Sequence, residues 1–133
     1  MILLDTHVVL WWQAGGQRLS TAAERAIARA GTILISPITC WEITALVVKG
    51  RIALDREIYH WIADLLDGER IEEAPLSPQA AVGAGLLVSP DFPGDPADRL
   101  LYATARQFMV PFVTKDARLR DHARSAKDVR VVW

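Results

Sequence analysis

Five acidic residues in this chain have a type and spacing that could support chemistry. They are Asp5, Glu42, Asp95, Asp98 and Asp116. Carboxylates that crowd together repel one another and need a counter-charge to stay ionised. Mg²⁺ and Mn²⁺ prefer oxygen ligands, and such an ion lowers the pKa of bound water and stabilises charge on a phosphoryl oxygen. If these acids converge in space, they predict metal-assisted hydrolysis of a phosphodiester.

The first of these acids ends an apolar segment. Residues 1–4 carry no charge, and Asp5 follows them directly. An unbroken apolar run of this kind is typical of a strand buried on both faces of a parallel sheet. Because ligands of open α/β sheets bind at the carboxyl ends of strands, we expect Asp5 to be the centre of the acidic site.

The elements needed to bring the other acids to Asp5 can be read along the chain. Further strands are predicted at residues 32–35, 70–74, 110–114 and 129–132, and helices at 8–12, 21–30, 37–49 and 58–66 and from residues 78, 95 and 115. Thr21 and Glu24 match a capping box, which predicts Thr21 as a helix N-cap. Residues 88–94, with two prolines and a glycine, predict a loop. This alternation predicts one domain over residues 1–133 with a three-layer α/β/α fold around a parallel sheet.

Each acid also has an ordinary structural explanation. Asp5 could be a turn residue at the end of a strand, and Glu42 a solvated helix residue. Asp95 precedes a proline at a helix start, which suits an N-cap. Asp98 and Asp116 would gain from the helix dipole as first-turn acids. Spacing alone therefore leaves the metal-binding and structural interpretations open.

Composition narrows the class of protein without identifying it. The formal net charge of the 133 residues is −1, so no overall basic field indicates a nucleic-acid partner, although a local basic patch is compatible with this total. Cys40 is the single cysteine, which excludes an internal disulfide and a cysteine-based zinc site. We see no signal peptide and no apolar stretch near the roughly 20 residues of a membrane span. These features predict a cytoplasmic protein with no membrane partner.

Several segments, in their order along the chain, resemble the PIN-domain family. They are LLDTHVVLWW, ISPITCWEIT, GDPADRLLYATA, FVTKDARL and the closing VRVVW. The similarity covers nearly the whole chain and is greatest to the toxin ribonucleases of VapBC-type toxin–antitoxin pairs. It implies that Asp5, Glu42, Asp98 and Asp116 bind Mg²⁺ or Mn²⁺ and cleave RNA. It further implies a homodimer and a cognate VapB-type antitoxin as partner.

Residues around these acids have further candidate roles. Asp95 matches an extra acid of one subgroup, and its role stays open between helix cap, orienting residue and metal ligand. Thr6 and Thr114 could add hydroxyl contacts to an acid or to a metal-bound water. Arg99 and Lys115, each adjacent to an acid, are the preferred candidates for pairing with RNA phosphates.

Two other classes of function remain as alternatives. A receiver-like signalling domain has a similar length and a late lysine, but it needs an acidic pair after the first strand, where Thr6 follows Asp5. Phosphorylation by acetyl phosphate would identify it. A non-catalytic PIN-fold module that binds RNA or protein is the second alternative, and divalent-ion-dependent RNA cleavage would separate it from the enzyme.

Overall fold

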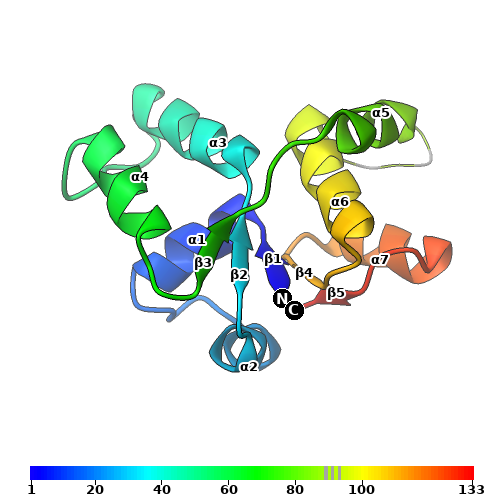
Figure 1. Cartoon of the computed structure of the whole chain (residues 1–133), viewed down its shortest axis with the longest axis horizontal. Coiled ribbons are helices and arrows are strands. Elements are labelled where there is room, and N and C mark those ends of the chain that lie inside the picture. Colours follow the sequence, from blue (N-terminus) through cyan, green and yellow to red (C-terminus); the bar gives the residue numbers. More distant parts are fainter. Residues whose placement is uncertain (89, 91, 93) are drawn as a thin grey trace.

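A parallel sheet forms the centre of the protein (Figure 1). The computed structural model describes residues 1–88, 90, 92 and 94–133, and within them five parallel strands are ordered β3-β2-β1-β4-β5. The strands are β1 (Ile2–Leu4), β2 (Ile33–Ile35), β3 (Ile71–Glu73), β4 (Phe112–Val113) and β5 (Val131–Val132). The helices are α1 (Thr6–Gln13), α2 (Thr21–Arg29), α3 (Pro37–Val48), α4 (Ile58–Leu66), α5 (Pro78–Leu86), α6 (Pro96–Phe108) and α7 (Ala117–Ala126).

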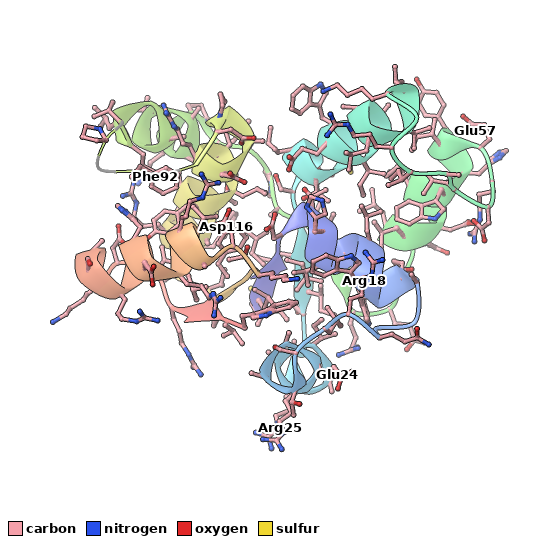
Figure 2. The ribbon with its side chains drawn as sticks, turned by 180° about the vertical axis from the view of Figure 1, so that it is seen from behind. Arg18, Glu24, Arg25, Glu57, Phe92 and Asp116 are labelled. Carbon is pink, nitrogen blue, oxygen red and sulfur yellow. The ribbon has the colours of Figure 1, made fainter. Side chains whose placement is uncertain are left out.

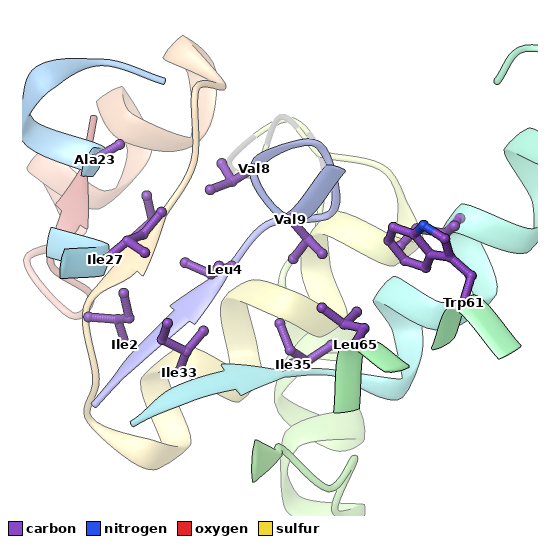
Figure 3. Close-up of a cluster of buried hydrophobic side chains, with 12 residues drawn as sticks. Ile2, Leu4, Val8, Val9, Ala23, Ile27, Ile33, Ile35, Trp61 and Leu65 are labelled. Carbon is purple, nitrogen blue, oxygen red and sulfur yellow. The ribbon is translucent and has the colours of Figure 1, made fainter. Parts of the chain in front are cut away.

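Helices cover both faces of this sheet. Successive side chains of a strand point to opposite faces, so a strand that is apolar throughout needs a core on each side. Ile2 and Leu4 of β1 pack in a core with α1, α2 and α4, part of which is drawn in Figure 3. Leu3, between them, packs in a second core with α6 and α7. Helix α5 lies against α6. The predicted three-layer α/β/α fold with a parallel sheet is confirmed.

The order of the strands changes direction at β1. From β1 the chain proceeds outward to β2 and β3 on one side, and later to β4 and β5 on the other. Such a switch point is where open α/β sheets bind their ligands, beyond the carboxyl ends of the strands. Asp5 directly follows β1 and Thr114 directly follows β4, so the two neighbouring central strands end in polar side chains.

The predicted helix starts at residues 21, 37, 58 and 78 agree with the structure, whereas α1, α6 and α7 begin at Thr6, Pro96 and Ala117 instead of residues 8, 95 and 115. The cap of α2 also differs from the prediction. Ser36 and Ser77 cap α3 and α5, each followed by a proline in the first turn. Helix α2 is capped by Ser20, whose hydroxyl accepts a hydrogen bond from the Ala23 N–H at 3.1 Å. The predicted Thr21 cap is therefore wrong: Thr21 is already the first helical residue, because the extended backbone conformation of a cap occurs one residue earlier.

The other differences concern the lengths of elements. The last two strands are shorter than predicted, with β4 and β5 of two residues each. The loop predicted over residues 88–94 lies partly outside the described residues, since positions 89, 91 and 93 are not among them. Within the described part of the chain, no helix has the length and hydrophobicity that crossing a membrane requires.

Candidate active site

Asp5 lies at the end of β1, and both of its carboxylate oxygens accept hydrogen bonds. Oδ1 accepts from the backbone N–H of Thr6 at 2.7 Å, and Oδ2 accepts from the hydroxyl of Thr114 at 2.6 Å. The Thr114 hydroxyl also accepts from the N–H of Asp116 at 3.1 Å. Burial raises the pKa of Asp5, and the Thr114 hydrogen bond opposes this rise. The ends of β1 and β4 are thus joined through the half-buried carboxylate of Asp5.

Glu42 approaches the same place from α3. Its Oε1 accepts a hydrogen bond from the Thr6 hydroxyl at 2.6 Å, and that hydroxyl also lies 3.2 Å from the hydroxyl of Thr39. Thr6 and Thr39 are both buried. Burial raises the pKa of Glu42, and the nearby charges of Asp5 and Asp95 raise it further.

Asp95 and Asp98 form a reciprocal capping box at the start of α6. The Asp98 N–H donates to Oδ1 of Asp95 at 2.9 Å, and the Asp95 N–H donates to Oδ2 of Asp98 at 3.2 Å. Burial and the negative charges of Asp95 and Asp5 raise the pKa of Asp98 to about 7. A helix N-terminus ordinarily favours a carboxylate, so this rise shows how strongly burial and neighbouring acids oppose ionisation here.

Asp116 caps α7, and Figure 2 labels it at the start of this helix. Its Oδ1 accepts hydrogen bonds from the N–H groups of Arg118 and Leu119, at 2.8 and 3.2 Å. Its Oδ2 lies 3.5 Å from the Arg118 guanidinium. Asp116 therefore has a structural role as a cap in addition to its position beside Asp5.

All five acids line one pocket of about 330 Å³. The complete lining is Asp5, His7, Trp11, Glu42, Asp95, Asp98, Lys115 and Asp116. The Lys115 ammonium lies 5.4 Å from the centroid of the Trp11 ring, a cation–π contact at the pocket wall. Among the described residues, no three histidine, cysteine or acidic side chains are already arranged as a metal-binding group. The pocket is a strongly acidic hollow at the switch point of the sheet.

Comparison with known proteins identifies the family. A model of the PIN domain matches residues 2–125. The chain belongs to the PIN-domain family. It is 43% identical over 121 residues to Ribonuclease VapC22 of Mycobacterium tuberculosis (strain ATCC 25618 / H37Rv), a match that covers 91% of each protein.

Solved structures share the fold of this PIN domain. VapBC2 from Rickettsia felis, bound to a DNA fragment from its promoter, matches with a TM-score of 0.68 and 16% identity over 98% of this chain and 97% of that one. Mycobacterium tuberculosis VapC20, described as a Sarcin-Ricin loop cleaving toxin, matches with a TM-score of 0.63 and 15% identity over 94% and 95% of the two chains. At these identities the similarity establishes the fold.

The PIN domain brings together most of the residues singled out from the sequence. Besides the acids, Thr6 and Thr114 are buried and hydrogen-bonded to them, and Lys115 lines the pocket. Arg99 is different: its Nε donates to the Gly94 carbonyl at 3.3 Å, and it is not among the described residues that line the pocket. Of the two phosphate-binding candidates, Lys115 is therefore the better placed.

Three residues at the site were not predicted to take part in it. Thr39 lies one helical turn before Glu42, a spacing that places both on one face of α3 and could have indicated it. His7 and Trp11 also line the acidic pocket. The sequence favoured structural roles for both, since no serine or cysteine nucleophile is evidently paired with His7 and a tryptophan such as Trp11 usually packs in a core or interface. They are four residues apart on α1, so a helix that begins at Thr6 turns both toward the same side.

Proposed function

We propose that this protein is a divalent-metal-dependent endoribonuclease of the VapC toxin type, acting through a PIN domain over residues 1–133. The observation that carries the proposal is the convergence of Asp5, Glu42, Asp98 and Asp116 on one pocket from four different elements. The identity of 43% to a relative named as a ribonuclease supports RNA as the substrate. The reaction is hydrolysis of RNA phosphodiester bonds.

The donor set fits Mg²⁺ or Mn²⁺. The acids of the pocket offer oxygen ligands only, and the pKa values of Asp5, Glu42 and Asp98 are raised because burial and mutual repulsion oppose their negative charge. A cation among them would relieve both effects. Mg²⁺ keeps several of its waters and uses only one or two carboxylates directly, which suits acids that share a pocket without forming a closed cage.

Asp5, Glu42, Asp98 and Asp116 would hold the ion, which supplies a bound water of lowered pKa and stabilises charge on the phosphoryl group. Other side chains of the protein orient these acids. The Thr114 hydroxyl fixes Oδ2 of Asp5. Asp95 caps α6 and its charge raises the pKa of Asp98, so we assign it an orienting role.

Two further side chains complete this arrangement. The Thr6 hydroxyl fixes the orientation of Glu42. Lys115, at the pocket wall, would pair with an RNA phosphate next to the cleaved bond.

A second, larger pocket of about 950 Å³ supports a VapB-type antitoxin as partner. Its wall shares His7 and Trp11 with the acidic pocket, so an occupant would lie beside the site. Apolar residues line much of it, including Leu10, Leu46, Ile52, Leu54 and Trp61. Arg56 at its wall pairs with Asp55 and Asp64, and Arg18 and Arg51 add positive charge. We propose that an antitoxin peptide with apolar anchors and acidic groups binds there, as the match to a VapBC complex suggests.

Cleavage of a structured RNA tests the proposal. The purified protein should cut the RNA with Mg²⁺ or Mn²⁺ and stop when EDTA is added. Asp5→Asn should lose at least about 100-fold in rate, since an acid that binds the ion is removed while its shape is kept. Asp121→Asn, at an exposed acid of α7 paired with Arg124, should cut at the wild-type rate. Undiminished cleavage by Asp5→Asn would remove Asp5 from the site. Metal-independent binding of RNA without cleavage would favour the non-catalytic module.

A further inference from the structure

The carboxylate of Asp98 is confined by a glycine that precedes its helix. A methyl group added at Gly94 would lie 2.6 Å from Cβ of Asp98 and 2.6 Å from Cε1 of Phe92, far inside van der Waals contact. Gly94 does not have the positive φ that restricts a site to glycine. Its lack of a side chain is therefore required by space alone, because the backbone passes between the Phe92 ring and the Asp98 side chain.

Phe92 fixes the other side of this contact. Its side chain is only 2% exposed, and its ring packs edge-to-face on Tyr102 and His122, with centroid distances of 5.2 and 4.9 Å. Tyr102 belongs to α6 and His122 to α7, and Figure 2 shows Phe92 beside these two helices. Phe92 thus packs on both helices that present acids to the pocket, α6 with Asp98 in its first turn and α7 with Asp116 as its N-cap.

Tyr102, on which Phe92 packs, is held in place by Asp128. The Tyr102 hydroxyl donates to Oδ1 of Asp128 at 2.5 Å, and Oδ2 of Asp128 pairs with Arg106 at 3.2 Å. Tyr102 is four residues after Asp98, so the two share one face of α6. A continuous set of contacts therefore runs from Asp128 through Tyr102 and Phe92 to Gly94 and the Asp98 carboxylate.

We propose that Gly94 and Phe92 are positioning residues that hold the Asp98 carboxylate in the acidic pocket. This inference rests on the proposed function, because its consequence is measured as binding of a divalent ion. Neither residue lines the pocket or offers a ligand, so each acts through Asp98. Outer partners that orient a metal-binding side chain change metal affinity by about 10- to 100-fold when removed.

Titration of Mn²⁺ into the full-length protein by isothermal titration calorimetry tests the inference. Gly94→Ala must displace Asp98 or Phe92. We expect it to raise the Mn²⁺ dissociation constant by about tenfold. The matched control is Gly85→Ala on α5, where an added methyl group meets no atom within 4 Å and φ is not positive. This variant should bind Mn²⁺ as the wild type does.

A second pair of variants separates positioning from loss of folding. Phe92→Leu keeps an apolar side chain but loses both edge-to-face contacts, and it should weaken Mn²⁺ binding in the same direction as Gly94→Ala. Phe108→Leu makes the same change at a more exposed position of α6 and should leave binding unchanged. Thermal unfolding in EDTA confirms that each variant is folded at the titration temperature, since a purely structural role would lower the melting temperature without changing the affinity.

The outcomes are distinct. Weaker Mn²⁺ binding by both Gly94→Ala and Phe92→Leu, with unchanged controls, supports the inference. Wild-type affinity in either folded variant overturns it and leaves the proposed ribonuclease intact. Absence of Mn²⁺ binding by the wild-type protein overturns the proposed function and this inference with it.

Discussion

The carboxylates of Asp5 and Asp98 differ in their hydrogen bonds, but the pKa of each is raised. Asp5 accepts hydrogen bonds at both carboxylate oxygens, whereas Asp98 accepts one, from the backbone N–H of Asp95. Both have raised pKa values, because burial and neighbouring acids disfavour the ionised form. Without a cation, these acids therefore lower the free energy of unfolding of the protein relative to uncharged side chains. Binding sites commonly reduce stability in this way.

Asp98→Asn should stabilise the protein without metal at about pH 8. The pKa of Asp98 lies near 7 against an ordinary value of 3.8, so the folded state holds the proton more tightly than the unfolded chain. Asp98 therefore contributes stability at low pH that is lost as the pH rises from about 4 to about 7. Because solvent reaches part of the side chain, we expect a gain of about 1–2 kcal/mol in the free energy of unfolding.

Urea unfolding of the wild type and Asp98→Asn in EDTA, across pH 4 to 8, measures this difference. The two proteins should have similar stability near pH 4 and diverge above it. A variant that is less stable than the wild type at pH 8 would contradict the account, because it would show that the ionised Asp98 stabilises the metal-free fold.

Thr114→Val should reduce RNA cleavage by about 10- to 100-fold while the protein stays folded. The substitution keeps the size of the side chain but removes the hydroxyl that donates to Oδ2 of Asp5 at 2.6 Å, and such orienting contacts have effects of this size. Thr104→Val is the matched control, since Thr104 is equally buried but donates to the Leu100 carbonyl within α6. Steady-state rates of RNA cleavage by the two variants test this prediction. Equal rates would mean that the hydrogen bond from Thr114 to Asp5 is not needed for cleavage.

Most acids of the site lie at the starts of helices. Asp5, Asp95 and Asp116 are N-caps of α1, α6 and α7, so residues that end a strand or begin a helix are the same residues that line the pocket. Asp98 lies in the first turn of α6, and Glu42 is the one acid of the five that comes from beyond the first turn of a helix. Helix α3 is fixed by the Ser36 cap and by the Thr6 hydrogen bond. The orientation of each helix therefore sets the direction of its acid.

Ser36→Ala should cost about 1 kcal/mol of stability and also reduce RNA cleavage. Ser36 is fully buried, and its hydroxyl accepts from the Ile38 N–H at 3.1 Å at the start of the helix that carries Glu42. Ser20→Ala removes the corresponding cap of α2, a helix that carries no pocket residue, and should lower stability similarly with normal cleavage. Chemical denaturation and cleavage assays on both variants test this, and equal activities would show that the α3 cap serves stability alone.

Sequence patterns were sufficient for elements with strong local signals. Buried strands such as Ile33–Ile35 are β-branched or leucine throughout, and the stripe on α4 repeats at helical spacing, so local composition determined both. The double role of Asp95 and Asp116 could not be decided, because capping and pocket lining use the same residue type. The contact of Tyr102 with Asp128 could not be predicted either, since 26 residues separate its partners and no periodicity links them.

At the scale of the whole molecule, the described residues form the acidic pocket, the larger pocket that shares His7 and Trp11 with it, and an exposed apolar surface on α3. Trp61, for which the sequence favoured core or interface packing, is buried in the core with 9% exposure. Trp41 is 64% exposed on α3, next to Glu42, and Val48 at the end of α3 is 81% exposed. Trp41 and Val48 are seven residues apart and so lie on one side of α3, and a patch of exposed apolar side chains marks an association surface. We propose α3 as the contact of the predicted homodimer.

Trp41→Glu should favour the monomer over the proposed homodimer. A charge placed in an apolar contact must be desolvated on association, which opposes dimer formation. Tyr59→Glu is the control, because Tyr59 is 83% exposed but lies on α4. Sedimentation velocity measures both masses, and a dimer that persists in Trp41→Glu would exclude α3 as the contact.

The central claim is that the acids of the 330 Å³ pocket bind a divalent ion. Crystals soaked in Mn²⁺ and measured for anomalous scattering test it most directly. The account predicts a strong anomalous peak inside this pocket, contacted directly or through water by Asp5 and Asp98, and no such peak in Asp5→Asn crystals treated in the same way. A fully soaked wild-type crystal whose pocket shows no anomalous peak would contradict it.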